Sequence, residues 1–167
     1  KNLAKHLMSN LKFGGVSKKL KNTSFPFFYN DLIGLKKLIK TKNIGIVKME
    51  VMRNEIPKDN FLLKVRKLCD HKKIVLIFDE CTSGFRENLG GKHLDYKIYP
   101  DIALFGKAIG NGYPINAIIG KKNIMQCAEK TFISSTFWTE RSGSVAALET
   151  INQMKKIKSY EYVKKQG

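Results

Sequence analysis

The sequence has few of the residues that mark disulfide-bonded, metal-binding or membrane proteins. Its 167 residues include three cysteines, Cys69, Cys81 and Cys127, an odd number without the close spacing of a zinc site. Free thiols of this kind are typical of a reducing compartment, so we predict a cytoplasmic protein without structural disulfides. No run of about 18 apolar residues occurs, and therefore no membrane-spanning helix and no membrane partner are expected.

Arginine is also scarce, although the chain is strongly basic. Lysine and arginine total 31 against 14 acidic residues, a net charge of +17, but only Arg53, Arg66, Arg86 and Arg141 are arginines. Proteins that read bases or grip phosphates bidentately favour the planar guanidinium of arginine. The lysines are scattered along the chain, so we predict a solvated basic surface and no nucleic-acid partner. A basic nucleic-acid-binding domain stays as a distant alternative, which would bind tightly and with strong salt dependence.

Short apolar runs alternate with segments of helical periodicity. Asn30 or Asp31 is expected to cap a first helix and Asp59 a second one, with further helices near Lys122 and over 142–158. Strands are expected over 44–49, 74–78, 102–106 and 115–119. Strands that alternate with helices predict an α/β fold with a mainly parallel sheet flanked by helices.

Two of these apolar runs end at residues with complementary chemistry. Asp79 follows the run over 74–78, and Lys107 follows the run over 102–106. Open α/β sheets bind ligands outside the carboxyl ends of their strands, so the carboxylate and the amine are expected at the same edge. A lysine that forms a Schiff base and an aspartate that holds the ring nitrogen protonated are what pyridoxal 5′-phosphate (PLP) chemistry requires.

The pair Asp79-Glu80 allows a second interpretation. An apolar strand followed by two acidic residues also describes the Mg²⁺-binding strand of a P-loop NTPase. That function requires a Gly-x-x-x-x-Gly-Lys-[Ser/Thr] loop, and no stretch of this sequence fits it, the segment 14–18 included. A loop of this kind before Lys1 would restore the P-loop NTPase fragment as an alternative.

Longer motifs support the first interpretation. Residues 77–86, Ile-Phe-Asp-Glu-Cys-Thr-Ser-Gly-Phe-Arg, and 100–114, from Pro100 to Pro114, resemble the signature of the class III PLP-dependent aminotransferases. The branch they resemble is that of glutamate-1-semialdehyde aminomutase, and the match extends to 28–31, 50–55 and 135–139. The resemblance implies the large-domain fold of the fold-type I PLP-dependent transferases. It also implies that residues 1–167 form a partial PLP-binding large domain, with the N-terminal segment and the C-terminal small domain absent.

The resemblance also implies a function. The cofactor would be PLP, and the reaction would move an amino group from a small-molecule amino donor to a carbonyl acceptor. Lys107 would form the Schiff base and then transfer protons, while Asp79 would hold the ring nitrogen protonated. An intramolecular aminomutase of the glutamate-1-semialdehyde type is the alternative, because the same residues serve both reactions. The chain by itself is expected to be inactive.

Further site residues follow from the same resemblance. Cys81 stands where the family usually has a valine packed on the pyridine ring, and Thr82 where relatives carry a polar side chain near the ring hydroxyl. Ser135 and Thr136 match the segment that in this family reaches the PLP phosphate of the neighbouring subunit, so the resemblance implies a homodimer.

Two residues are candidates for substrate binding. Glu50 ends a predicted strand and matches a family glutamate, and Arg53 could bind a substrate carboxylate through its planar fork. The three histidines, His6, His71 and His93, form no catalytic triad and no metal-binding pattern. We therefore expect no metal site and no role for them in the chemistry.

Overall fold

The computed structural model describes residues 17–20, 22–137 and 139–166. The chain divides into two compact units, Lys1–Ile44 and Gly45–Gly167. The described part of the first unit contains a short 3-10 helix, η2 (Lys18–Leu20), and the helix α1 (Leu32–Thr41). The Asp31 side chain caps α1 by accepting a hydrogen bond of 2.8 Å from the backbone N–H of Gly34, which confirms one of the two predicted caps.

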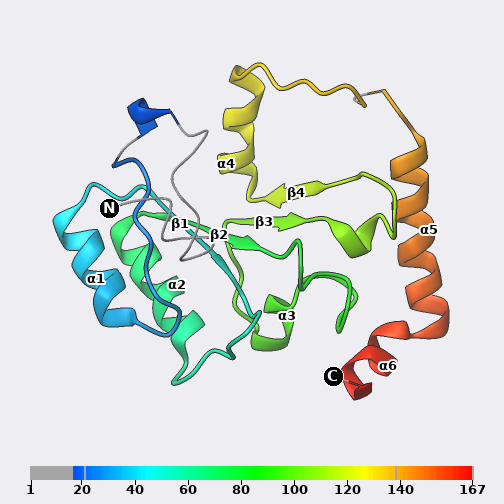
Figure 1. The fold of residues 1–167 in the computed structure, drawn as a ribbon, viewed down its shortest axis with the longest axis horizontal. Coiled ribbons are helices and arrows are strands. Elements are labelled where there is room, and N and C mark those ends of the chain that lie inside the picture. The colour runs from blue at the N-terminus through cyan, green and yellow to red at the C-terminus, as the bar shows by residue number, and fades with distance from the viewer. Residues whose placement is uncertain (1–16, 21, 138, 167) are drawn as a thin grey trace. The chain divides into compact units, whose positions relative to one another are not determined.

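The second unit is built on a four-stranded sheet with the strand order β1-β2-β3-β4 (Figure 1). The strands are β1 (Ile46–Glu50), β2 (Val75–Asp79), β3 (Ile102–Phe105) and β4 (Ala117–Gly120). β1 pairs with β2 and β2 with β3 in parallel, whereas β4 runs antiparallel to β3. This confirms the predicted α/β fold with a mainly parallel sheet.

Within its described residues, this unit has seven helical segments that connect and flank the strands. They are α2 (Phe61–Lys72), α3 (His93–Tyr96), η3 (Lys107–Ile109), α4 (Lys122–Met125), η4 (Gln126–Lys130), α5 (Ser142–Ile157) and α6 (Ser159–Gln166). The predicted cap of α2 was wrong. Asn60, not Asp59, stands at the N-cap position, and it makes no side-chain capping bond. Both residues adopt left-handed backbone conformations, with φ of 49° and 56°, which is not the extended conformation that a capping side chain needs.

The two faces of the sheet differ in burial. Alternate residues of β1, β2 and β3 point to one face and are buried there, among them Val47, Met49, Leu76, Phe78, Ala103 and Phe105. Helix α2 contributes Phe61, Leu62, Val65 and Cys69 to the core, and Ala147 of α5 packs with Ala103, Phe105 and Ile109. The strand residues that alternate with these buried ones, such as Lys48 and Ile77, point to the other face and are only half-buried or exposed. The sheet therefore has one closed face and one open face.

The buried carboxylate of Asp101 holds the amino-terminal ends of β2 and β3, at the edge of the sheet opposite to Asp79. Asp101 Oδ2 accepts hydrogen bonds from Arg66 at 3.0 Å and from the backbone N–H of Leu76 at 2.8 Å. Its Oδ1 forms an ion pair of 2.7 Å with Lys121. Burial opposes the charge of Asp101, but these donors outweigh it and hold the pKa of Asp101 below its ordinary value.

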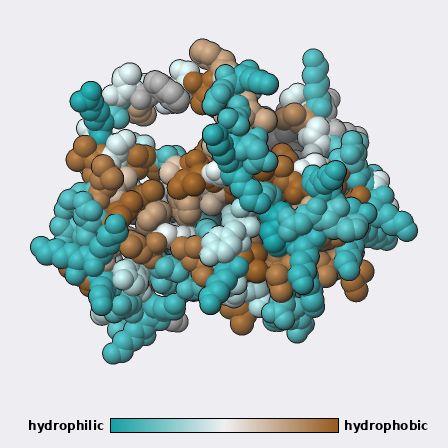
Figure 2. Space-filling model, turned by 180° about the vertical axis from the view of Figure 1, so that it is seen from behind, coloured by the Kyte–Doolittle hydropathy of each residue, from teal (hydrophilic) through white to brown (hydrophobic). Residues whose placement is uncertain are grey.

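The described residues of the connection between η4 and α5, 131–137 and 139–141, lie in an arch along one edge of the unit (Figure 1). Figure 2 shows an opening beneath this arch from behind. The described residues of the arch are exposed, and Phe132 is 97% exposed. In the described part of the chain, no helix combines the length and the apolar character needed to cross a membrane.

Candidate active site

Asp79 is the last residue of β2 and points to the open face of the sheet. Its Oδ1 accepts a hydrogen bond of 3.2 Å from the backbone N–H of Cys81, and its Oδ2 forms an ion pair of 2.9 Å with Lys48 of β1. Partial burial raises the pKa of Asp79, but the hydrogen bonds from Lys48 and Cys81 outweigh it, and the pKa lies below its ordinary value. Asp79 is therefore held as a carboxylate with a fixed orientation.

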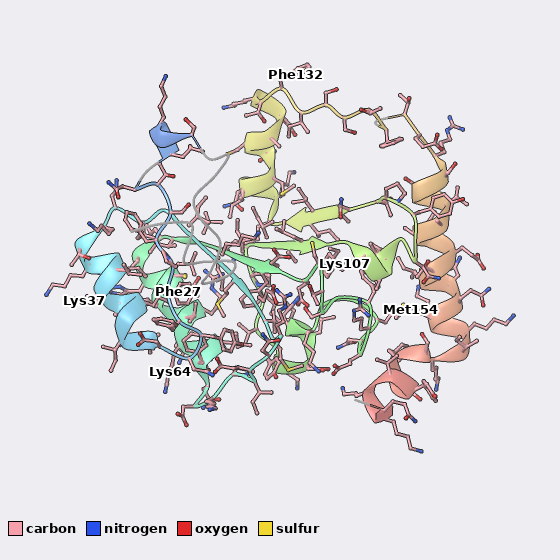
Figure 3. The ribbon with its side chains drawn as sticks, viewed as in Figure 1. Phe27, Lys37, Lys64, Lys107, Phe132 and Met154 are labelled. Carbon is pink, nitrogen blue, oxygen red and sulfur yellow. The ribbon has the colours of Figure 1, made fainter. Side chains whose placement is uncertain are left out.

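Lys107 lies at the end of the neighbouring strand, directly after Gly106 (Figure 3). Its side chain is exposed, and its Nζ donates a hydrogen bond of 3.4 Å to the hydroxyl of Thr82, which lies three residues after Asp79. The φ of Lys107 is +47°, a left-handed conformation that costs a non-glycine residue free energy and is common at functional sites. The turn after β2 and the turn after β3 thus bring Lys107 to the Asp79 segment.

Gly106, just before Lys107, packs closely against the side chain of Asn116. A Cβ atom there would lie 2.5 Å from Oδ1 of Asn116 and 3.4 Å from Sγ of Cys81. Cys81 is half-buried, and burial together with the neighbouring carboxylate of Asp79 raises the pKa of its thiol, although the charge of Lys107 opposes this. Cys81 therefore stands in the site as a neutral, soft side chain.

Glu50 lies next to Asp79, because the parallel pairing of β1 and β2 sets these two residues opposite each other. Glu50 Oε1 forms an ion pair of 3.2 Å with Arg53, an exposed residue of the loop after β1. The second oxygen, Oε2, is buried and has no partner within the described structure. The structure thus brings Glu50 and Arg53 to the same edge of the sheet as Asp79.

A buried network centred on Glu80 holds the segment that follows Asp79. Glu80 is fully buried and accepts hydrogen bonds from Ser83 Oγ at 2.6 Å and from the backbone N–H groups of Lys92 and His93 at 2.8 and 2.9 Å. Its Oε1 also lies 2.7 Å from Nδ1 of His93. Burial raises the pKa of Glu80, but these donors outweigh it and lower the pKa overall. Glu80 thereby closes the loop over 81–92 and fixes the turn that carries Cys81 and Thr82.

One of the three histidines, His93, belongs to this network through its buried ring. His71 lies in the last turn of α2, and His6 lies outside the described residues. No group of three or more histidine, cysteine, aspartate or glutamate residues that could hold a metal ion occurs in the ranges that the structure describes.

Ser135 and Thr136 are not brought to the other site residues. Both lie in the exposed arch, whereas Lys107 lies just beyond the carboxyl end of β3 (Figure 3). Trp138, in the same segment, is outside the described residues. A cavity of about 570 Å³ lies on another side of η3, where Ala108, Asn111 and Met154 contribute to its lining. Asp79 and Lys107 do not line it, so we place the site at the strand ends.

The side chains at these strand ends fit a PLP molecule by their chemistry. Lys107 supplies an amine, Asp79 a carboxylate with free lone pairs, and Thr82 a hydroxyl, all at the carboxyl ends of β2 and β3. An aldehyde, a protonated ring nitrogen and a ring hydroxyl are the complementary groups of PLP.

Sequence reasoning missed Lys48 and Glu80 as members of this constellation. Lys48 could have been found, because it stands two residues before Glu50 in an apolar strand and alternation sets both on one face. Glu80 gave no signal of its own, since its partners in the loop over 81–93 become its neighbours only when that loop closes.

Comparison with known proteins gives a consistent result. The family model of the class III aminotransferases matches residues 52–167. The 3-aminobutyryl-CoA aminotransferase of Cloacimonas acidaminovorans is 37% identical over 163 residues, which are 92% of this chain and 39% of that protein. The glutamate-1-semialdehyde 2,1-aminomutase of Campylobacter hominis is 41% identical over 115 residues, which are 66% of this chain and 26% of that protein.

Among solved structures, the PLP internal aldimine form of the FumI protein of Sphingopyxis sp. MTA144 is similar in fold to this chain. It shares 29% sequence identity and a TM-score of 0.71, over 76% of this chain and 33% of the other. This chain therefore spans between about a quarter and two fifths of the length of these proteins.

Proposed function

We propose that this chain, which belongs to the class III aminotransferase family, carries the cofactor-anchoring part of a PLP-dependent aminotransferase. One observation carries the proposal: the amine of Lys107 and the carboxylate of Asp79 lie at the carboxyl ends of two adjacent parallel strands. The family match includes the Asp79-Glu80 pair, and Glu80 is satisfied by protein donors alone. We therefore prefer this function to that of a P-loop NTPase.

PLP, when bound, supplies an aldehyde that condenses with amines and a ring that accepts the electron pair released at a substrate carbon. Lys107 would hold the cofactor covalently through Nζ and later accept and return the proton at the α-carbon of the substrate. Its hydrogen bond to the neutral Thr82 hydroxyl suits this task. The other nearby amine, that of Lys48, is bonded to a carboxylate instead.

The neighbouring side chains would orient the cofactor. Asp79 would accept a hydrogen bond from the protonated ring nitrogen, Thr82 would bind the ring hydroxyl, and Cys81 would pack against the ring face. Glu50 and Arg53 would meet the substrate, because the fork of Arg53 suits a carboxylate and the unpartnered Oε2 of Glu50 can accept one more donor. A small-molecule amino donor and a carbonyl acceptor are the substrates of this proposal.

Covalent labelling tests this function directly. Borohydride reduction of the full-length protein loaded with PLP is expected to fix one cofactor per chain on Lys107, located by peptide mass spectrometry. Lys48 is the internal control, because it is the other lysine beside Asp79. Label on Lys48, or label spread over many surface lysines, would contradict the assignment.

An aminomutase is the second candidate, favoured by the 41% identity to the glutamate-1-semialdehyde enzyme of Campylobacter hominis. The two functions differ in stoichiometry. An aminotransferase needs an amino donor and a separate carbonyl acceptor, whereas an aminomutase converts one substrate without a second one. Turnover of purified full-length protein with each substrate set decides between them.

We further propose a homodimer in which Ser135 and Thr136 reach the PLP phosphate of the partner subunit. Two observations support it. The arch that carries them is far from Lys107 within one chain, and it exposes large apolar side chains such as Phe132 and Phe137. Surfaces of this kind commonly mark an interface. Hydroxyl groups suit a phosphate dianion.

Mixed dimers test this arrangement. One subunit carries Lys107→Ala, and the other carries Ser135→Ala together with Thr136→Ala. If the phosphate contact crosses the interface, both lesions fall in one site of the heterodimer, and activity is expected to recover to about half of wild type. If each chain binds its own phosphate, each site keeps one lesion and activity stays at the level of the parents. The test requires a weak hydroxyl-deleted parent, and two lost bonds to a charged group at about 1.5–3 kcal/mol each make it weak.

A further inference from the structure

Lys48 is a cation at the cofactor site to which neither the motif nor the proposed reaction assigns a role. It stands in the middle of β1 between Val47 and Met49, which are both buried in the closed face. Its own side chain lies on the open face, where its Nζ is 2.9 Å from Oδ2 of Asp79. Because Lys48 is paired with Ile77 and Glu50 with Asp79, the lysine reaches Asp79 diagonally across the two strands.

We propose that Lys48 is a positioning residue that keeps Asp79 ionised and oriented, so that a proton shared between Asp79 and the cofactor stays on the ring nitrogen. This inference rests on the proposed function, in which that nitrogen is the partner of Asp79. Lys48 lies outside residues 52–167, which the family model matches.

The contact geometry of Asp79 supports this role. A carboxylate offers about four lone pairs, of which Lys48 occupies one on Oδ2 and the backbone N–H of Cys81 occupies one on Oδ1. The carboxylate cannot rotate without losing one of these bonds, and it still has capacity for a further donor. Lys48 therefore fixes the direction of the remaining lone pairs and does not block them.

Electrostatics decide where a shared proton lies. Both Lys48 and a protonated ring nitrogen are donors, so they cannot bond to each other and must approach Asp79 from different directions. The Coulomb interaction falls with distance, so the ammonium stabilises the adjacent carboxylate more than it destabilises a more distant ring cation. The net effect of Lys48 is to make Asp79 the weaker base of the pair.

Other charged groups near Asp79 do not replace Lys48. Glu50, opposite Asp79 on β1, is compensated by its ion pair with Arg53 at 3.2 Å. Lys107, after β3, is hydrogen bonded to Thr82 instead. Cys81, in the turn after β2, donates to Asp79 through its backbone N–H and also through its neutral thiol. Among the described residues, Lys48 is the cation that directly contacts Asp79.

Three variants of the full-length protein test the inference without the cofactor. Lys48→Met removes the charge at similar length, Lys48→Arg keeps it, and Lys64→Met removes an equivalent charge from the exposed surface of α2 (Figure 3). The titration of Asp79 is followed by NMR of ¹³C-labelled aspartate in PLP-free protein, with its signal assigned from its loss in Asp79→Asn.

We expect the pKa of Asp79 to rise by about one unit in Lys48→Met, the lower end of the range for a close opposite charge, because Lys48 is partly exposed. The difference should shrink between about 0.05 and 0.5 M salt, as expected for a partly exposed pair. Lys48→Arg and Lys64→Met should titrate as wild type. Wild-type titration of Asp79 in Lys48→Met would overturn the inference.

A second readout separates this inference from the proposed function. In protein loaded with PLP labelled with ¹⁵N in the ring, the ring nitrogen of Lys48→Met should be less protonated than in wild type and in Lys48→Arg. An unchanged nitrogen signal in Lys48→Met would also overturn the inference. If wild-type protein holds no PLP, the proposed function fails, and with it the part of the inference that concerns the ring nitrogen. The carboxyl titration then still decides whether Lys48 controls the charge of Asp79.

Discussion

Replacement of Lys107 by alanine in the full-length protein is expected to lower transamination by at least about 10⁴-fold. General acid–base catalysis alone contributes about 10² to 10⁴-fold, and the covalent attachment of the cofactor is lost in addition. Borohydride should no longer fix PLP to the protein, whereas the fold should persist. The side chain of Lys107 is exposed and makes one weak hydrogen bond of 3.4 Å. Turnover at saturating substrate and the mass of the reduced protein measure both effects.

Lys155→Ala is the matched control, because it removes an exposed lysine from α5. It should keep wild-type turnover and wild-type labelling. Added small primary amines should restore part of the lost activity of Lys107→Ala, since a free amine can move the same proton when the space is vacant. Residual borohydride-stable PLP at Lys48 in the alanine variant, with substantial turnover, would show that the wrong lysine was assigned.

The strand ends could be predicted because they depend on local pattern. The end of an apolar run predicted Asp79 at the end of β2 and Lys107 just beyond β3, and the structure places both there. The cap of α1 was equally local, since Asp31 and Gly34 are three residues apart. A capping bond of this kind joins close neighbours in the chain, so it does not depend on how distant segments pack.

The interactions of these residues could not be predicted in the same way. The ion pair between Lys48 and Asp79 joins two strands, and it follows only from their register. The contact between Glu80 and His93 requires a loop of twelve residues to close on itself. The Asp59 cap failed because the backbone enters α2 through two left-handed residues, a conformation that composition does not reveal. The phosphate role of Ser135 and Thr136 depends on a second chain, and it stays a prediction.

Asp79→Asn is expected to lower turnover by about 10²-fold while PLP remains attached to Lys107. Asparagine keeps the shape of the side chain, and its carbonyl oxygen can still accept from the backbone N–H of Cys81. It loses the negative charge that holds the ring nitrogen protonated. The loss of one preorganised electrostatic contact in an active site costs about 3 kcal/mol in the transition state. Turnover at saturating substrate and borohydride labelling measure the two parts of this expectation.

A double mutant shows whether Asp79 acts through its charge. In the Asp79→Asn background, Lys48 has no carboxylate to hold, so Lys48→Met should cause no further loss of turnover. In the wild-type background the same substitution should lower turnover, because it moves a shared proton away from the ring nitrogen. Additive effects of the two substitutions would mean that Lys48 acts independently of Asp79. Near wild-type turnover of Asp79→Asn would show instead that the carboxylate does not hold the ring nitrogen protonated, and a cofactor partner would then have to be sought elsewhere at this edge of the sheet.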